Sequence, residues 1–204
     1  MAIKAEREYR MLQLPEMQFR AADNEEEQYI VEGYATTFDD PYVLYSYDGK
    51  DYKEQIARDA LTGTQMDDVI FLYNHEGMVF ARISNGTLQL NADEHGLHVR
   101  ADLSSTEDSR RMFESIKAGL VTQMSWAFSV DDEEYDERTR TRTIKHVKRM
   151  YDVSAVSIPA NDKTDISARS YWDGVIAEEA RREAARKEKV NRVKNLLKGE
   201  TDEH

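Results

Sequence analysis

The sequence between residues 28 and 158 is a succession of short apolar segments separated by turn residues, and this pattern limits the fold more than any other. Runs of about four to eight residues rich in aromatic and β-branched side chains are typical of β-strands. Such runs lie at 28–35, 69–75, 97–103 and 151–158. Many short strands with few helices bury their apolar side chains by packing sheets together or by closing a barrel. The predicted class is therefore α+β, mostly β, with a barrel or sandwich and a few helices.

Two turn signals predict how neighbouring strands are joined. Asn85-Gly86 lies between the apolar segments 80–83 and 88–90, and both residues tolerate positive φ, so this pair is a hairpin signal of the strongest short-range kind. A second turn at 93–96 leads into the strand that follows it. Both turns are predicted to close hairpins.

The longest predicted hairpin pairs residues 123–132 with residues 138–150. One arm is acidic and the other basic, so facing side chains can form pairs worth about 0.2–1 kcal/mol each. Pairs of this strength set the register of a hairpin more than they add to its stability. The acidic arm carries Asp131, Asp132, Glu133 and Glu134, and the basic arm carries Arg138, Arg140 and Arg142.

Two short helices are predicted to interrupt the strands. The first covers residues 51–61. The second covers residues 106–120, where Ser105 and Asp108 resemble a capping box that satisfies the free amides of the first turn. The apolar side of the first helix carries Ile56, Ala60 and Leu61, and that of the second carries Met112, Phe113, Ile116 and Leu120.

The composition changes near residue 170. Residues 171–204 are rich in Ala, Glu, Arg and Lys, and their eight basic and eight acidic residues cancel, so the acidic excess of twelve lies entirely in residues 1–170. We therefore expect a body at 1–170 and a charged tail at 171–204, helical over 173–198. Opposite charges four residues apart support an exposed helix. These pairs are Glu178 with Arg182 and Glu183 with Lys187.

The composition also excludes several functional classes. The chain has no cysteine, which excludes disulfides, thiolate metal sites and a cysteine nucleophile. Its net charge of −12 opposes nucleic-acid binding, because a nucleic-acid site needs basic groups to neutralise phosphates. The longest apolar run has about five residues, whereas a membrane span needs about 20 and the core of a signal peptide about 7–15. We expect an intracellular protein that binds neither nucleic acid nor a membrane.

Ser125 is a candidate nucleophile because of the strand that carries it. Side chains alternate between the two faces of a strand, which puts Ser125, Ala127 and Ser129 on one face and large apolar residues on the other. A nucleophile needs such rigid support, with open space above its hydroxyl for a substrate. The pattern alone favours a simpler interpretation, a strand whose solvent face carries small residues. The apolar face carries Met124, Trp126, Phe128 and Val130.

His75 and Asp152 are the candidate partners of this serine. His75 ends the strand 69–75, before the turn expected at Glu76-Gly77, where a general base stays partly exposed to solvent. Taken alone, it is more simply an exposed or hydrogen-bonded histidine. Asp152 lies inside an apolar strand, where a buried carboxylate needs a partner. That partner is either the imidazole N–H of a triad or an arginine of the basic arm.

Other chemistries have weaker support. His95 and His98 lie at one hairpin tip and, with His75, are the candidates for a metal-dependent hydrolase, although no further ligands accompany them. Gly33 and Gly86 are isolated and do not form a phosphate-binding motif. The GxSxG elbow of α/β-hydrolases does not occur. No cofactor and no metal are therefore predicted.

Five motifs occur in a specific order along residues 25–170. They are Gly33-Tyr34-Ala35; Phe71-Leu72-Tyr73-Asn74-His75-Glu76; Lys117-Ala118-Gly119-Leu120 leading into Met124-Ser125-Trp126; Tyr151-Asp152-Val153-Ser154; and Ile158-Pro159-Ala160-Asn161. Each motif is weak alone, but the five together resemble the tailed-phage prohead (capsid maturation) protease family, which is related to the herpesvirus assemblins.

The resemblance implies a serine endopeptidase whose fold is a closed or partly open β-barrel surrounded by a few helices. Ser125 matches the nucleophile and His75 the general base. Asp152 stands where many members carry a glutamate as the third residue, which is a departure because aspartate is one methylene shorter. The turn at residues 160–163 is suggested for the oxyanion hole.

The resemblance also implies substrates, partners and a location. Such enzymes cut scaffold and the scaffold-like segment of the major capsid protein, and usually themselves, inside the immature prohead in the host bacterial cytoplasm. Assemblins act as dimers, so a homodimer is allowed by analogy. The tail is then either a solvated helix or a helix that docks to scaffold. The main rival is a non-enzymatic capsid-assembly or scaffold protein on the same fold.

Overall fold

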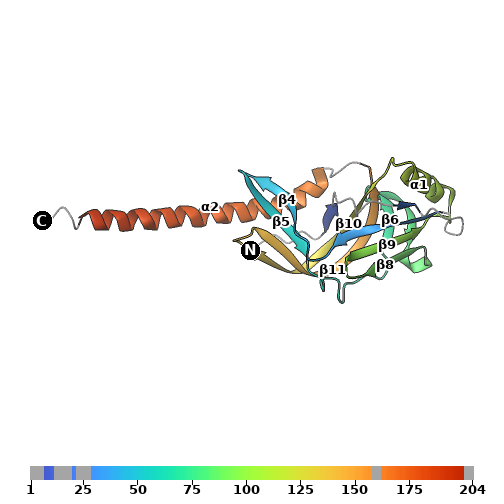
Figure 1. Cartoon of the computed structure of the whole chain (residues 1–204), viewed down its shortest axis with the longest axis horizontal. Coiled ribbons are helices and arrows are strands. Elements are labelled where there is room, and N and C mark those ends of the chain that lie inside the picture. The colour runs from blue at the N-terminus through green and yellow to red at the C-terminus, as the bar shows by residue number, and fades with distance from the viewer. Residues whose placement is uncertain (1–6, 12–19, 22–28, 158–161, 200–204) are drawn as a thin grey trace. The chain divides into compact units, whose positions relative to one another are not determined.

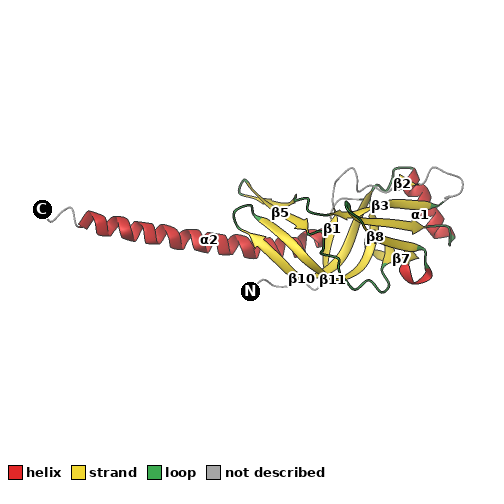
Figure 2. Ribbon diagram, turned by 60° about the horizontal axis from the view of Figure 1, so that its bottom comes forward, coloured by secondary structure: helices red, strands yellow, loops and turns green. Residues whose placement is uncertain are grey.

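The computed structural model describes residues 7–11, 20–21, 29–157 and 162–199. The chain divides into two compact units, Lys4–Ala168 and Arg169–His204, the second of which also includes Met1–Ile3. The first unit is mostly β, as the sequence predicts, with the short helix α1 (Glu107–Lys117) beside β2 (Arg20–Ala21) (Figure 2).

The strands of the first unit form two sheets (Figure 1). The larger sheet has the order β1-β10-β11-β5-β4, and β11 also pairs with β6, which pairs with β7. The smaller sheet has the order β2-β3-β9-β8. The strands of the larger sheet are β1 (Glu8–Met11), β4 (Tyr42–Tyr47), β5 (Lys50–Ile56), β6 (Ile70–Tyr73), β7 (Glu76–Arg82), β10 (Gln123–Asp136) and β11 (Thr141–Val156). Those of the smaller sheet, besides β2, are β3 (Ile30–Thr37), β8 (Leu88–Ala92) and β9 (Gly96–Asp102).

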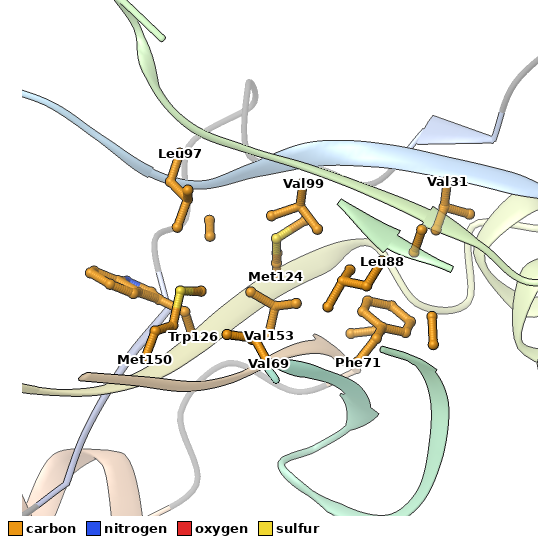
Figure 3. Packing of buried hydrophobic residues seen from close by; sticks show 14 of the residues in the cluster. Val31, Val69, Phe71, Leu88, Leu97, Val99, Met124, Trp126, Met150 and Val153 are labelled. Carbon is orange, nitrogen blue, oxygen red and sulfur yellow. The ribbon is translucent and has the colours of Figure 1, made fainter. Parts of the chain in front are cut away.

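The hydrophobic core lies between the two sheets (Figure 3). Met124 and Trp126 of β10 and Val153 of β11 point from the larger sheet toward Val99 and Leu97 of β9. All five side chains are at most 1% exposed. The apolar face predicted for the strand around Ser125 is therefore the face that packs into the core.

The hairpin of β10 and β11 is the centre of the larger sheet, and its prediction is confirmed. The strand expected separately at 151–158 is instead the continuation of β11 through Val156. Along its length β11 pairs in parallel first with β5, from Thr141 to Ile144, and then with β6, from Asp152 to Ala155. Because one strand serves two neighbours, residues from distant parts of the sequence meet along it.

Two predictions about local structure are wrong. The helix expected at 51–61 is mainly the strand β5, in which the alternate residues Tyr52, Glu54 and Ile56 are buried between β4 and β11. Gly86 does adopt a positive φ, but as the cap of a short 3-10 helix (Ile83–Asn85). The strands on its two sides, β7 and β8, belong to different sheets and do not form a hairpin. The turn expected at 93–96 does join a hairpin, that of β8 and β9.

The helix expected at 106–120 is confirmed as α1, with small shifts at both ends. Its N-cap is Thr106, whose side chain accepts a hydrogen bond from the backbone N–H of Ser109, so the cap lies one residue after the expected Ser105. Leu120, expected on the apolar side, lies beyond the helix and is exposed.

The barrel stays a prediction, because the described strands pair as two sheets rather than as one closed sheet. The tail helix expected at 173–198 lies within α2 (Asp162–Gly199), where residues 181–194 are all exposed. Both expected ion pairs are present, Arg182 with Glu178 and Lys187 with Glu183. The division into a body and a tail at residue 170 stays a prediction. None of the described helices is long and apolar enough to cross a membrane.

Gly96 of β9 lies against the backbone of β3, and replacing it tests how these two strands pack. A bulge in β3 brings the backbone oxygen of Thr36 to 2.0 Å from the position of a Cβ at residue 96. We expect Gly96→Ala to lower the free energy of unfolding by about 3 kcal/mol, the upper range for overpacking. Chemical denaturation measures this loss. Gly63→Ala is the control, because Gly63 has a positive φ but open space around it, and should cost only about 1–2 kcal/mol. Equal losses would show that small backbone shifts relieve most of the contact with Thr36.

Candidate active site

Ser125 lies on β10 with its side chain on the face opposite the core, and it is buried. Its exposed fraction is 1%, and that of Ser129 on the same face is 7%. The simpler interpretation of this strand, a solvent-exposed face of small residues, is therefore wrong. β1 pairs with β10 at this point, with Met11 opposite Ser125, and the Arg10 carbonyl lies 3.0 Å from Ser125 Oγ, where open space was expected.

His75 lies in the two-residue turn between β6 and β7. Asn74 and His75 have φ values of 51° and 60°, as a tight turn between antiparallel strands requires. The turn is thus at Asn74-His75 and not at Glu76-Gly77. The backbone N–H of His75 donates to Ser154 Oγ at 3.2 Å, which helps to hold this conformation. The imidazole is 12% exposed, and its Nε2 lies 2.7 Å from Ser125 Oγ.

Asp152 lies on β11, fully buried, on the other side of the imidazole. Its Oδ1 is 2.5 Å from His75 Nδ1 and also accepts a hydrogen bond from Ser154 Oγ at 2.9 Å. Its Oδ2 pairs with Arg7. The carboxylate therefore has both partners considered from the sequence, an imidazole and an arginine, although the arginine comes from the N-terminal segment rather than from the basic arm.

The charge of Asp152 fixes the proton on the imidazole. Burial alone would raise the pKa of Asp152, but the hydrogen bond from His75, with Ser154 and Arg7, outweighs burial and lowers this pKa. An ionised carboxylate only accepts hydrogen bonds, so His75 Nδ1 carries the proton. The lone pair of Nε2 then faces the Ser125 hydroxyl. In this arrangement the histidine can take a proton from the serine while Asp152 stabilises the resulting imidazolium.

The segment formed by Arg7 and β1 contacts all three of these residues, and it was not predicted from the sequence. Arg7 pairs with Asp152, the Tyr9 ring packs edge-on against the His75 ring at 4.8 Å, and the Arg10 carbonyl accepts a hydrogen bond from Ser125 Oγ at 3.0 Å. A four-residue strand with alternating charged side chains has little apolar periodicity. This strand becomes predictable only when the charged side chains that face it, on β5 and β11, are known.

Those facing charges form a buried cluster that anchors β1 to the larger sheet. Arg10 Nε lies 2.5 Å from Glu54 Oε1. Arg142 Nη1 lies 2.7 Å from Glu8 Oε2 and 2.8 Å from Glu54 Oε2. Arg142 also pairs with Glu133, as expected for the acidic and basic arms. Burial opposes the ionisation of Glu8, but Arg10 and Arg142 outweigh it and lower the pKa of Glu8 to about 2.

Removing one member of this cluster should be costly. We expect Arg142→Met to lower the free energy of unfolding by about 3–5 kcal/mol, because it leaves the buried carboxylates of Glu8 and Glu54 without one of their cations. Denaturant unfolding followed by circular dichroism measures the change. Lys145→Met is the matched control on the same strand: its pair with Glu134 is largely exposed, so the loss should stay below about 1 kcal/mol. A loss below about 1 kcal/mol for Arg142→Met as well would mean that the cluster adds little to stability.

The other histidines considered for a metal site lie elsewhere in the first unit. His95 and His98 pack edge-on against the Tyr34 ring, whose hydroxyl donates to Asp93 at 2.7 Å. Within the part of the chain that the structure describes, no three His, Asp or Glu side chains gather where they could hold a metal ion. Of the turn suggested for the oxyanion hole, residues 160 and 161 lie outside the described residues.

The chain is similar in sequence to known proteins of one family. A family model described as caudovirus prohead serine protease matches residues 15–174. The prohead protease of Escherichia phage T5 is 29% identical over 109 residues, which cover 53% of this chain and 50% of that protein. The prohead protease of Enterobacteria phage HK97 is 28% identical over 150 residues, which cover 72% of this chain and 63% of that protein. Each alignment thus spans less than two thirds of the relative. No solved structure matches the chain.

Proposed function

The chain belongs to the family of caudovirus prohead serine proteases, and on this premise we propose that it is a serine endopeptidase in which Ser125 is the nucleophile and His75 the general base. The observation that carries the proposal is the continuous hydrogen-bonded path from Ser125 Oγ to His75 Nε2 at 2.7 Å and from His75 Nδ1 to Asp152 at 2.5 Å. Asp152 holds the imidazole in its orientation. The 2.5 Å contact supports this role for an aspartate in spite of its shorter side chain.

The proposed reaction follows from the orientation of these groups. His75 Nε2 takes the proton of the Ser125 hydroxyl as Oγ attacks the carbonyl carbon of the scissile peptide bond. The imidazolium, stabilised by Asp152, then gives the proton to the leaving amine, and an acyl-enzyme remains on Oγ. A water molecule, activated by the same imidazole, hydrolyses this ester and restores the serine.

The proposed substrates are the scaffold and the scaffold-like segment of the major capsid protein, with the chain itself as a further substrate. The proposed place of action is the immature prohead in the host bacterium. The two phage relatives are named prohead proteases, which supports this assignment. A homodimer and a barrel closed beyond the two described sheets remain predictions within this proposal.

Co-expression tests the function directly. The full chain is produced together with the major capsid protein and scaffold of the same phage, and the masses and N-terminal sequences of these proteins are measured. We expect the capsid protein to lose a terminal segment at one defined bond, and the new N-terminus identifies that bond. If the capsid protein stays intact while particles assemble only when the chain is present, the rival function in assembly replaces the protease.

A further inference from the structure

We propose that the segment Arg7–Met11 occupies the substrate site of this enzyme from within the same chain, and that an extended substrate peptide must displace it from the edge of β10. This inference rests on the proposed protease function. It starts from the contacts of one short segment with all three members of the site: Arg7 with Asp152, Tyr9 with His75, and the Arg10 carbonyl with Ser125.

The segment lies where a peptide substrate has to lie. A nucleophile must come within about 3–3.5 Å of the carbonyl that it attacks. A backbone carbonyl of the chain itself already lies beside the nucleophile, since Ser125 Oγ donates a hydrogen bond of 3.0 Å to the Arg10 carbonyl oxygen. β1 pairs antiparallel with β10 from Glu8 opposite Phe128 to Met11 opposite Ser125. If β1 leaves, the edge of β10 is open for an extended peptide to pair in its place, a common mode of peptide recognition.

The same contacts keep the serine inactive. Ser125 has one hydroxyl proton, and in this state two acceptors compete for it, His75 Nε2 and the Arg10 carbonyl. A proton donated to the carbonyl is not donated to the base, so the nucleophile is not activated. The 1% exposure of Ser125 also leaves no room for a second peptide beside it.

The two charges that β1 adds to the buried cluster balance each other. β1 contributes one anion and one cation, Glu8 and Arg10, to the buried cluster, so its departure leaves the charge of the cluster unchanged. Arg142 retains Glu54 and Glu133 as partners after β1 has left. β1 also lies before residue 15, where the match to the protease family begins, so the matched region contains the three site residues but not the segment that covers them.

A reversible disulfide tests whether the segment blocks the site. Tyr9 and Ala127 are directly opposite each other in the register of β1 and β10, at a spacing suited to a disulfide. Because the chain has no cysteine, the variant Tyr9→Cys/Ala127→Cys has only this one possible intramolecular bridge. Oxidation locks β1 in place, and reduction of the same folded protein releases it. We expect the purified oxidised variant to cleave added capsid protein about 100-fold more slowly than the reduced variant, as for a population of the open state lowered to about 1%.

The controls separate blocking from a supporting role. The single variants Tyr9→Cys and Ala127→Cys should respond to neither oxidant nor reductant. If the locked enzyme cleaves as fast as the reduced enzyme, β1 is part of the working site and the proposal is overturned.

A second measurement does not depend on protease activity. In the Ser125→Cys variant the single thiol reports access to the site through its rate of reaction with a soluble disulfide reagent. We expect slow reaction in the full chain and at least about 10-fold faster reaction when Arg7→Ala and Tyr9→Ala remove the side chains that hold the segment over the site. Equal reaction rates with and without these two substitutions would show that the segment does not cover the site, and would overturn the proposal. If these substitutions accelerate the thiol reaction but the chain cleaves no capsid protein, the protease function is overturned. The proposal that Arg7–Met11 occupies the site then still stands.

Discussion

Replacing Ser125 with alanine is expected to reduce the rate of capsid-protein cleavage by about 10⁶-fold, the loss seen when a serine nucleophile is removed from a comparable triad. The reason is geometric. Ser125 Oγ is the oxygen 2.7 Å from the base, and a methyl group in its place leaves His75 with no hydroxyl to deprotonate. The rate is measured from the appearance of the shortened capsid protein during co-production, and with purified protein over a longer time.

Ser129→Ala is the matched control for this prediction. Ser129 lies two residues further along β10, on the same face and also buried, but its hydroxyl accepts a hydrogen bond from Tyr151 at 3.5 Å and does not contact His75. Its replacement should leave cleavage within a few-fold of the wild type, about 1 kcal/mol or less. Cleavage that persists in Ser125→Ala and is abolished by a chelator would instead favour the metal-dependent hydrolase considered for His75, His95 and His98.

The second large effect concerns the base and its carboxylate, which should not be equally important. We expect His75→Ala to reduce cleavage by about 10⁶-fold, and Asp152→Asn by a smaller factor of about 10⁴. Removing the imidazole removes the base placed to accept the serine proton. An asparagine at position 152 keeps the shape of the side chain but can donate to Nδ1, which favours the wrong tautomer of the imidazole.

A second histidine–carboxylate pair in this protein provides the control for these variants. His146 Nδ1 lies 2.5 Å from Asp131 Oδ1, the same spacing as in the site, but this pair is far more exposed and lies away from Ser125. His146→Ala and Asp131→Asn should therefore leave the cleavage rate unchanged. Equal losses for His75→Ala and Asp152→Asn would mean that the carboxylate is essential rather than supporting.

The three candidate site residues were predicted from the sequence, but the way in which they meet was not. Alternation along residues 124–130 correctly assigned the core face of β10, because period two is a local property of any strand. The contact of His75 with Asp152 depends on the parallel pairing of β6 with the second part of β11. Parallel neighbours are joined by long connections, so no local pattern specifies them.

The wrong predictions about the fold also arise from contacts between residues that are distant in the sequence. Residues 51–56 carry charged and apolar side chains in an order compatible with a helix, and only the buried charge cluster shows why Glu54 must point inward from a strand. The Asn85-Gly86 pair specifies a tight turn but not which strands flank it. β1 was missed because four residues with two buried charges become a strand only through partners that are distant in the sequence.

The ion pair between Arg7 and Asp152 has a consequence for how acidity acts on this site. Arg7 is one of the groups that lower the pKa of Asp152, so its withdrawal with β1 raises that pKa. Glu8 behaves in the same way, since its pKa is about 2 only while Arg10 and Arg142 surround it in the cluster. The covered state therefore binds fewer protons than the released state at acidic pH, below the ordinary pKa of Glu8 of about 4.5. By linkage, acidification favours release of the segment and neutral pH favours its retention. Access to the serine is thus coupled to proton concentration by the same two carboxylates that hold the segment in place.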